Sequence, residues 1–185
     1  MRAPVVPIRV HTHISAPREQ VFDLLADMAG RPSWTDHYMK DFRLENPRSS
    51  GTGAAARFRL DAPFHRQWVE TEIVEADRPR RVVEATRGGR LGHSPGEVVY
   101  ELTPQGRSLT RVDMTLSTEP GMARERVQEK LGSRWWLRRQ ARSSLERLRA
   151  IFEERPDEPL ERATVAGWEP TRGPRFGTGT RPARG

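Results

Sequence analysis

The chain has 185 residues, a length that suits one domain with a sizeable hydrophobic core. It contains no cysteine, which excludes disulfides, thiolate metal sites and a cysteine nucleophile, and which fits a reducing cytoplasm. The formal charge is +7, but charges of both signs are scattered along the chain, so an arginine-rich composition explains the excess without an anionic partner. We expect no signal peptide and no membrane-spanning helix, and therefore a soluble cytoplasmic protein.

The N-terminal part predicts one strand followed by one or two helices. Residues 8–14 alternate apolar with polar side chains, which is the pattern of a strand with one buried face. Ser15 is then expected to cap a helix that has Pro17 in its first turn, and a glycine and a proline at 30–32 are expected to end it. Trp34 follows in a short turn or a second helix.

The central part, from about residue 38 to 118, predicts an antiparallel meander. Short runs of alternating apolar and polar residues are separated by turn formers such as glycine, proline and asparagine. The first two runs are expected to form a hairpin. The expected strands cover residues 42–45, 56–60, 67–74, 81–86, 97–103 and 109–117.

The C-terminal part predicts one long helix and a disordered tail. Residues 122–155 contain no proline, and ten Lys or Arg stand there against five Asp or Glu. In residues 156–185, proline and glycine supply ten of the thirty positions, so this segment has too little apolar surface to offset its ordering entropy. The expected division is one domain over residues 1–155 and a disordered Pro/Gly/Arg-rich tail over 156–185.

A family resemblance supports this order of elements. Residues Ile14 to Asp27, with Ala-Pro before a charged pair and then Val-Phe, and the following Pro32-Ser33-Trp34, resemble the START/Bet v 1-like (SRPBCC) superfamily, in particular its polyketide cyclase/dehydrase and lipid-transport group. The resemblance covers roughly residues 8–152. It implies an α+β helix-grip fold, in which a curved antiparallel sheet of about seven strands wraps around the long C-terminal helix.

Such a fold leaves an apolar cavity between sheet and helix, so the first functional hypothesis is the binding or transport of a hydrophobic small molecule, lipid-like or polyketide-like. Strand and helix periodicity assigns a set of residues to the cavity wall. The predicted lining consists of Trp34, Phe58, Leu60, Val69, Thr71, Tyr100, Met114, Leu131 and Trp135, and Trp136 is then the exposed aromatic residue of the helix.

Two other functions stay open. The resemblance also allows a polyketide aromatase/cyclase or dehydrase, in which His37, His65 or Tyr100 would move protons. The basic helix also allows a contact with RNA or with an anionic membrane surface, of which nucleic acid is the less favoured partner.

No metal and no cofactor are expected. His11 and His13 lie on one face of the first strand, but two histidines do not make a zinc site, and the alternation points both to solvent. The pattern does not decide which way Glu84 points, because apolar residues surround it on both faces of its strand.

Overall fold

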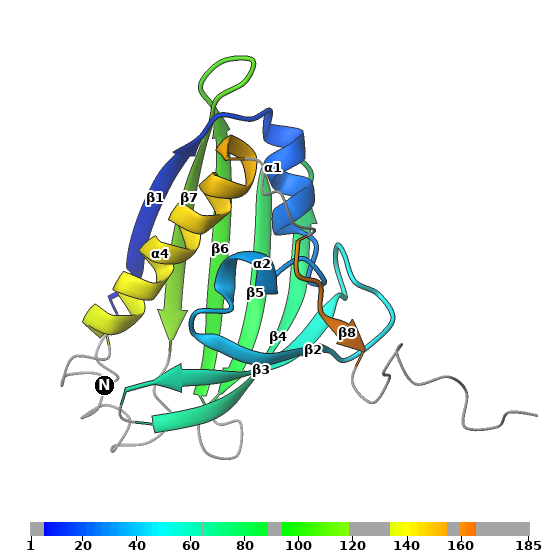
Figure 1. Cartoon of the computed structure of the whole chain (residues 1–185), viewed down its shortest axis with the longest axis vertical. Helices are drawn as coiled ribbons and strands as arrows, with labels where there is room; N and C mark the ends of the chain where they lie inside the picture. Colours follow the sequence, from blue (N-terminus) through cyan, green and yellow to red (C-terminus); the bar gives the residue numbers. More distant parts are fainter. Residues whose placement is uncertain (1–5, 64, 89–93, 119–133, 155–159, 166–185) are drawn as a thin grey trace, which may run out of the picture.

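The computed structural model describes residues 6–63, 65–88, 94–118, 134–154 and 160–165. They form an eight-stranded sheet with helices on one face, in the α+β arrangement of the helix-grip fold (Figure 1). The elements are β1 (Ile8–Ile14), α1 (Arg18–Leu25), α2 (Pro32–Thr35), β2 (Met39–Leu44), β3 (Ala55–Ala62), β4 (His65–Asp77), β5 (Arg81–Gly88), β6 (Ser94–Pro104), β7 (Thr110–Thr118), α4 (Arg134–Glu153) and β8 (Thr164–Val165).

The sheet has the strand order β1-β7-β6-β5-β4-β3-β2-β8, and all its pairs are antiparallel except the last. Neighbours along the chain from β2 to β7 are therefore neighbours in the sheet, which confirms the predicted meander and its first hairpin. Between β1 and β2 the chain crosses the sheet through α1 and α2, so that β1 pairs with β7, the last strand of the meander. Figure 1 shows the sheet curving around α4, with β2 and β3 running across one end of the longer strands.

Alternation along the strands divides the sheet into two faces. The inner face is the one covered by α1, α2 and α4, and it is made of buried apolar side chains, for example Val10, Phe58, Ile73 and Val112. The helix α4 contributes Leu145 and Leu148 to the same core and packs against β1 and α2, while α1 packs against β5 and β6. The outer face is largely polar, as expected of a sheet with one solvated side.

The first helix begins and ends differently from the prediction. Pro17, not Ser15, stands at the N-cap position, and the Ser15 hydroxyl instead donates a hydrogen bond to Glu153 on α4 at 3.0 Å. The helix ends at Leu25 because the chain turns away to bond with the 49–51 segment: the Met28 amide donates to the Ser49 carbonyl at 2.7 Å. The predicted short second helix at Trp34 is confirmed as α2.

The C-terminal elements agree with the prediction in part. The predicted long helix is present over α4, and its first residues, up to 133, lie outside the described residues. Residues 160–165, which the sequence assigns to a disordered tail, instead lie against the domain. β8 pairs with β2, the Ala163 amide donates to the Ala29 carbonyl at 2.7 Å, and Arg162 forms a 3.0 Å ion pair with Asp27. These polar contacts hold a short segment that has little apolar surface of its own.

Gly96 marks a close approach between β6 and its two neighbours. A Cβ atom at this position would lie 2.6 Å from the Thr86 hydroxyl oxygen and 3.0 Å from the Ser117 carbonyl oxygen. We expect Gly96→Ala to lower the free energy of unfolding by about 1–3 kcal/mol, measured by urea denaturation, because overpacking forces the strands apart. In a Thr86→Ala background the cost should be smaller; an equal cost in both backgrounds would show that this contact is not its cause.

Candidate functional site

A polar cluster lies in the middle of the otherwise apolar inner face. The Arg31 guanidinium donates to Glu84 Oε1 at 2.5 Å, to the Tyr100 hydroxyl at 2.8 Å and to the Leu25 carbonyl at 3.0 Å. Thr71 donates to the second oxygen of Glu84 at 3.4 Å. We call Arg31, Glu84, Tyr100 and Thr71 the buried polar cluster, because each of them is at most 5% exposed.

Aromatic rings enclose the guanidinium. Its central carbon lies 4.6 Å from the ring centroid of Trp34 and 5.5 Å from that of Tyr100, and the two rings meet edge to face. A desolvated cation over aromatic faces gains electrostatic energy from the ring quadrupoles. The arginine is therefore held by a carboxylate, a hydroxyl, a carbonyl and two rings together.

Burial and pairing shift the pKa values of these groups in physically distinct ways. Burial alone would lower the pKa of Arg31, but the adjacent Glu84 carboxylate outweighs it, so the net shift is upward. Burial raises the pKa of Tyr100, and the negative charge of Glu84 raises it further. Burial likewise raises the pKa of Tyr38 to about 12. The cluster thus keeps a permanent cation beside the neutral phenol of Tyr100, and the phenol of Tyr38 outside the cluster is neutral as well.

The fold positions these groups from distant parts of the sequence. Arg31 lies in the turn between α1 and α2, and its carbonyl accepts a hydrogen bond from Thr35 at 2.9 Å. Glu84 comes from β5 and Tyr100 from β6, where Tyr100 pairs with Val82, two residues from Glu84. The inner-face alternation therefore brings the carboxylate and the phenol together under the turn that bears the arginine.

Buried ion pairs seldom exist for stability alone, since the cost of desolvating two charges rivals the attraction between them. Strongly shifted groups held by a specific charge partner are also frequent at functional sites. The buried polar cluster is for these reasons the candidate site of this chain.

The predicted cavity lining divides into three groups. The side chains of Trp34, Phe58, Val69, Thr71, Tyr100 and Met114 are all buried on the inner face, and Leu60 is half-buried there. Leu131 lies outside the described residues. The inward orientation predicted for Trp135 is wrong: its side chain is 67% exposed, and Trp136 instead packs edge to face against Tyr38. In this turn of α4, Trp136 rather than Trp135 lies toward the domain, which differs from the helix periodicity assumed from sequence.

The three residues predicted to transfer protons do not come together in one site. Tyr100 belongs to the buried polar cluster. His37 is half-buried beside α4, where its Nε2 lies 3.4 Å from the Gln140 carbonyl oxygen, and burial lowers the pKa of its imidazole. His65 opens β4, and its side chain lies outside the described atoms.

Sequence reasoning missed Arg31. It stands between a glycine and a proline in a chain with 32 Lys and Arg residues, so its type and position gave no signal. The sequence did mark Glu84 as unusual, because apolar residues lie on both faces of its strand and the pattern did not show whether its side chain points inward or outward. A carboxylate on a buried strand face requires a cation, and the structure supplies Arg31.

One end of the inner face keeps exposed apolar surface. Leu60 on β3 and Val98 on β6 pack against the core but are only partly buried. Val98 is the strand partner of both Glu84 and Leu116, so this surface begins beside the buried polar cluster. We call the partly exposed inner-face positions Leu60 and Val98, with the buried Leu116 beside Val98, the open end.

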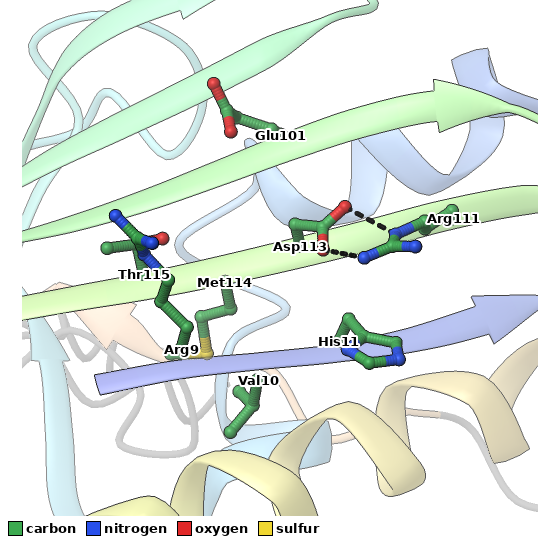
Figure 2. A pocket seen from close by; sticks show the side chains of 8 residues that line it. All are labelled: Arg9, Val10, His11, Glu101, Arg111, Asp113, Met114 and Thr115. Atoms are coloured by element: carbon green, nitrogen blue, oxygen red, sulfur yellow. Dashed lines mark hydrogen bonds and ion pairs between the residues drawn. The ribbon is translucent and has the colours of Figure 1, made fainter. Parts of the chain in front are cut away.

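A depression with a volume of about 370 Å³ lies along β1, β7 and β6 (Figure 2). Its polar side chains belong to the outer face, where Arg111 forms a bidentate ion pair with Asp113 at 2.8 and 2.7 Å. The Arg111 hydrogen bonds hold the pKa of Asp113 below its ordinary value. His11 lines the pocket and is exposed, as is His13, which agrees with the predicted outward direction. Within the described part of the chain, no three potential ligands are grouped closely enough to hold a metal ion.

Solved structures of several proteins share this fold. The protein TTHA0849 from Thermus thermophilus has 18% identity and a TM-score of 0.62, over 82% of this chain and all of that one. A START superfamily protein from Mycobacterium smegmatis has 12% identity and a TM-score of 0.55, over 81% and 99% of the two chains. The major latex-like protein 151 of Panax ginseng has 12% identity and a TM-score of 0.54, over 80% and 97%.

These likenesses show that the chain shares the fold of these proteins, the helix-grip fold. A search of curated proteins gave no match. The model of the family described as polyketide cyclase/dehydrase and lipid transport matches residues 6–153, which include every helix and strand from β1 to α4. The chain belongs to this family.

Proposed function

We propose that this protein binds a hydrophobic small molecule, lipid-like or polyketide-like, at the open end of the inner face. The observation that supports the proposal is the partly exposed apolar wall around Leu60 and Val98, beside a buried polar cluster. Ligand sites of this kind combine apolar walls with a few polar groups that fix orientation. The apolar wall would take the body of the molecule, and the cluster would form the polar floor beneath it.

Blocking the open end tests the proposal. A Val98→Trp variant should bind the apolar fluorophore 8-anilinonaphthalene-1-sulfonate at least about tenfold more weakly than the wild type, because the indole would cover the partly exposed inner face at this position. Glu97→Trp is the matched control, because the neighbouring side chain is exposed on the other face of the same strand. Mass spectrometry of organic extracts from both purified variants then shows whether a co-purifying molecule is lost only from Val98→Trp.

The result that would overturn the proposal is equal, saturable probe binding in the two tryptophan variants, or no saturable binding by the folded wild type. Circular dichroism and urea unfolding of both variants separate a blocked site from a damaged fold. Weaker binding by Val98→Trp at unchanged secondary structure supports the open end as the site.

A second candidate function is that of a polyketide cyclase or dehydrase, and one observation favours it. Arg31 and Tyr100 place hydrogen-bond donors in an apolar interior, where they could polarise a carbonyl group far more strongly than in water. In that case Tyr100→Phe should abolish the closure of a poly-β-ketone thioester at unchanged binding, as followed by product mass. His37→Gln and His65→Gln test the two remaining predicted residues, and turnover that survives all three changes would exclude this assignment.

A further inference from the structure

The charge of α4 is divided between its two halves. Residues 134–145 contain Arg134, Arg138, Arg139 and Arg142 and no carboxylate. The second half is balanced and paired, since Arg149 binds Glu153 on the same helix and Arg147 binds Asp36. Within the described part of the chain, no carboxylate lies within ion-pair distance of Arg138, Arg139 or Arg142, and all three side chains are exposed. The first half therefore presents uncompensated positive charge.

Exposed apolar side chains lie at the same place. Trp135 and Val6 are each 67% exposed, which makes them two of the four large hydrophobic residues exposed among those described. They are joined by Arg134, which donates to the Val6 carbonyl, while the Arg139 guanidinium lies 5.9 Å from the Trp135 ring centroid. We call the set Val6, Arg134, Trp135, Arg138, Arg139 and Arg142 the basic apolar patch.

Strand register places this patch at the open end of the inner face. Val6 lies two residues before Ile8, which pairs with Leu116, and Leu116 pairs in turn with Val98. Figure 1 shows the first turns of α4 at the end of the molecule where β1 begins and β7 finishes. The first turns of α4 and the partly exposed apolar side chain of Val98 thus lie toward the same end of the protein.

We propose that the basic apolar patch docks the protein on the surface of an anionic lipid bilayer. Arginines close to such a surface are attracted by its negative potential, and tryptophan prefers the depth of the headgroups. Val6 adds apolar area of a kind that a bilayer interface accepts. The guanidinium over Trp135 also occupies one ring face that base stacking on RNA would need.

Docking in this orientation turns the open end toward the acyl chains. A hydrophobic molecule could then pass between bilayer and inner face without crossing water. This consequence rests on the proposed function, whereas the docking itself does not, because the patch and the wall of the open end are made of different residues.

The test uses the full chain and vesicles of phosphatidylcholine with and without phosphatidylglycerol. Wild-type protein should co-sediment only with the anionic vesicles, and added salt should weaken the binding. The variant Arg138→Gln/Arg139→Gln/Arg142→Gln should bind about a hundredfold more weakly, at about 1 kcal/mol for each arginine. Arg78→Gln/Arg80→Gln/Arg107→Gln is the matched control, since it removes the same charge from the turns after β4 and β6 and should bind as the wild type does.

A second measurement reports how deeply Trp135 enters the bilayer. Brominated lipids in the anionic vesicles should quench part of the tryptophan fluorescence, and Trp135→Phe should lose that part. Equal binding by the two arginine triples, absence of binding to anionic vesicles, or tighter binding to single-stranded RNA than to vesicles would each overturn docking. Val98→Trp should still bind the vesicles, so a failure of the ligand proposal and a failure of docking give different results.

Discussion

Arg31→Leu is expected to lower the free energy of unfolding by about 3–5 kcal/mol, because it leaves the Glu84 carboxylate buried without its cation. Three hydrogen bonds of 2.5–3.0 Å and two aromatic rings hold the cation. Glu84→Leu should cost a similar amount, since it leaves the guanidinium as the unpaired charge. Urea denaturation at neutral pH measures both losses.

An exposed ion pair of comparable geometry provides the matched control. Arg78 binds Asp23 through two hydrogen bonds of 2.8 and 2.9 Å, yet more than half of each side chain is exposed. Arg78→Leu should therefore cost no more than about 1 kcal/mol. Similar losses for Arg31→Leu and Arg78→Leu would contradict the argument from burial.

The double variant Arg31→Leu/Glu84→Leu separates stability from function. With both charges gone, the apolar replacements should restore most of the lost stability, apart from the Tyr100 hydroxyl and Leu25 carbonyl that lose a donor. If the cluster orients a ligand, this stable double variant should nevertheless bind the apolar probe differently from the wild type. Restored stability with unchanged binding would assign the cluster a purely structural role.

The fold could be predicted from sequence because its signals are local. The alternation of apolar and polar residues in 8–14 and in the meander identified the strands and showed which side chains of each strand point toward the core. The inner-face positions of Phe58, Val69 and Met114 follow from this alternation. The curved sheet around the long C-terminal helix came from the family resemblance, whereas the strand register and the pairing of β1 with β7 are seen only in the structure. The alternation pattern and the family resemblance both concern the path of the backbone.

The polar interior could not be predicted because it depends on contacts between residues far apart in the chain. Arg31 and Glu84 are 53 positions apart, and Arg31 and Tyr100 are 69 apart. No pattern within a window of sequence links them. The error at Trp135 has a different cause, since neighbouring helix residues point about 100° apart, and in this turn Leu137 and the partly buried Trp136 lie toward the domain instead of Trp135. Helix periodicity predicts which apolar residues share one side of the helix. It does not predict which residue at the border of that side is buried, and here Trp136 packs against Tyr38.

Alkaline pH is expected to destabilise the protein through its two tyrosines. Both are buried, and burial raises the pKa of Tyr38 to about 12 and that of Tyr100 as well. Below about pH 10 the phenols are protonated in the folded and unfolded states, so this contribution to stability is fully present. Above that pH the unfolded chain releases its protons first. Stability should then fall by about 1.4 kcal/mol per pH unit for each tyrosine, which for Tyr38 amounts to about 2.7 kcal/mol by about pH 12.

The composition makes this effect unusually easy to isolate. The chain has only two lysines, Lys40 and Lys130, and arginine stays protonated throughout this range, so few other groups titrate. Urea unfolding at increasing pH should give a slope in Tyr38→Phe that is about half that of the wild type, and almost none in Tyr38→Phe/Tyr100→Phe. Ultraviolet absorbance of the phenolate provides the independent check on the native protein. Ionisation of Tyr38 at the pH of free tyrosine would mean that water reaches the interior beside α4, and that the buried polar cluster is open to a ligand from that side.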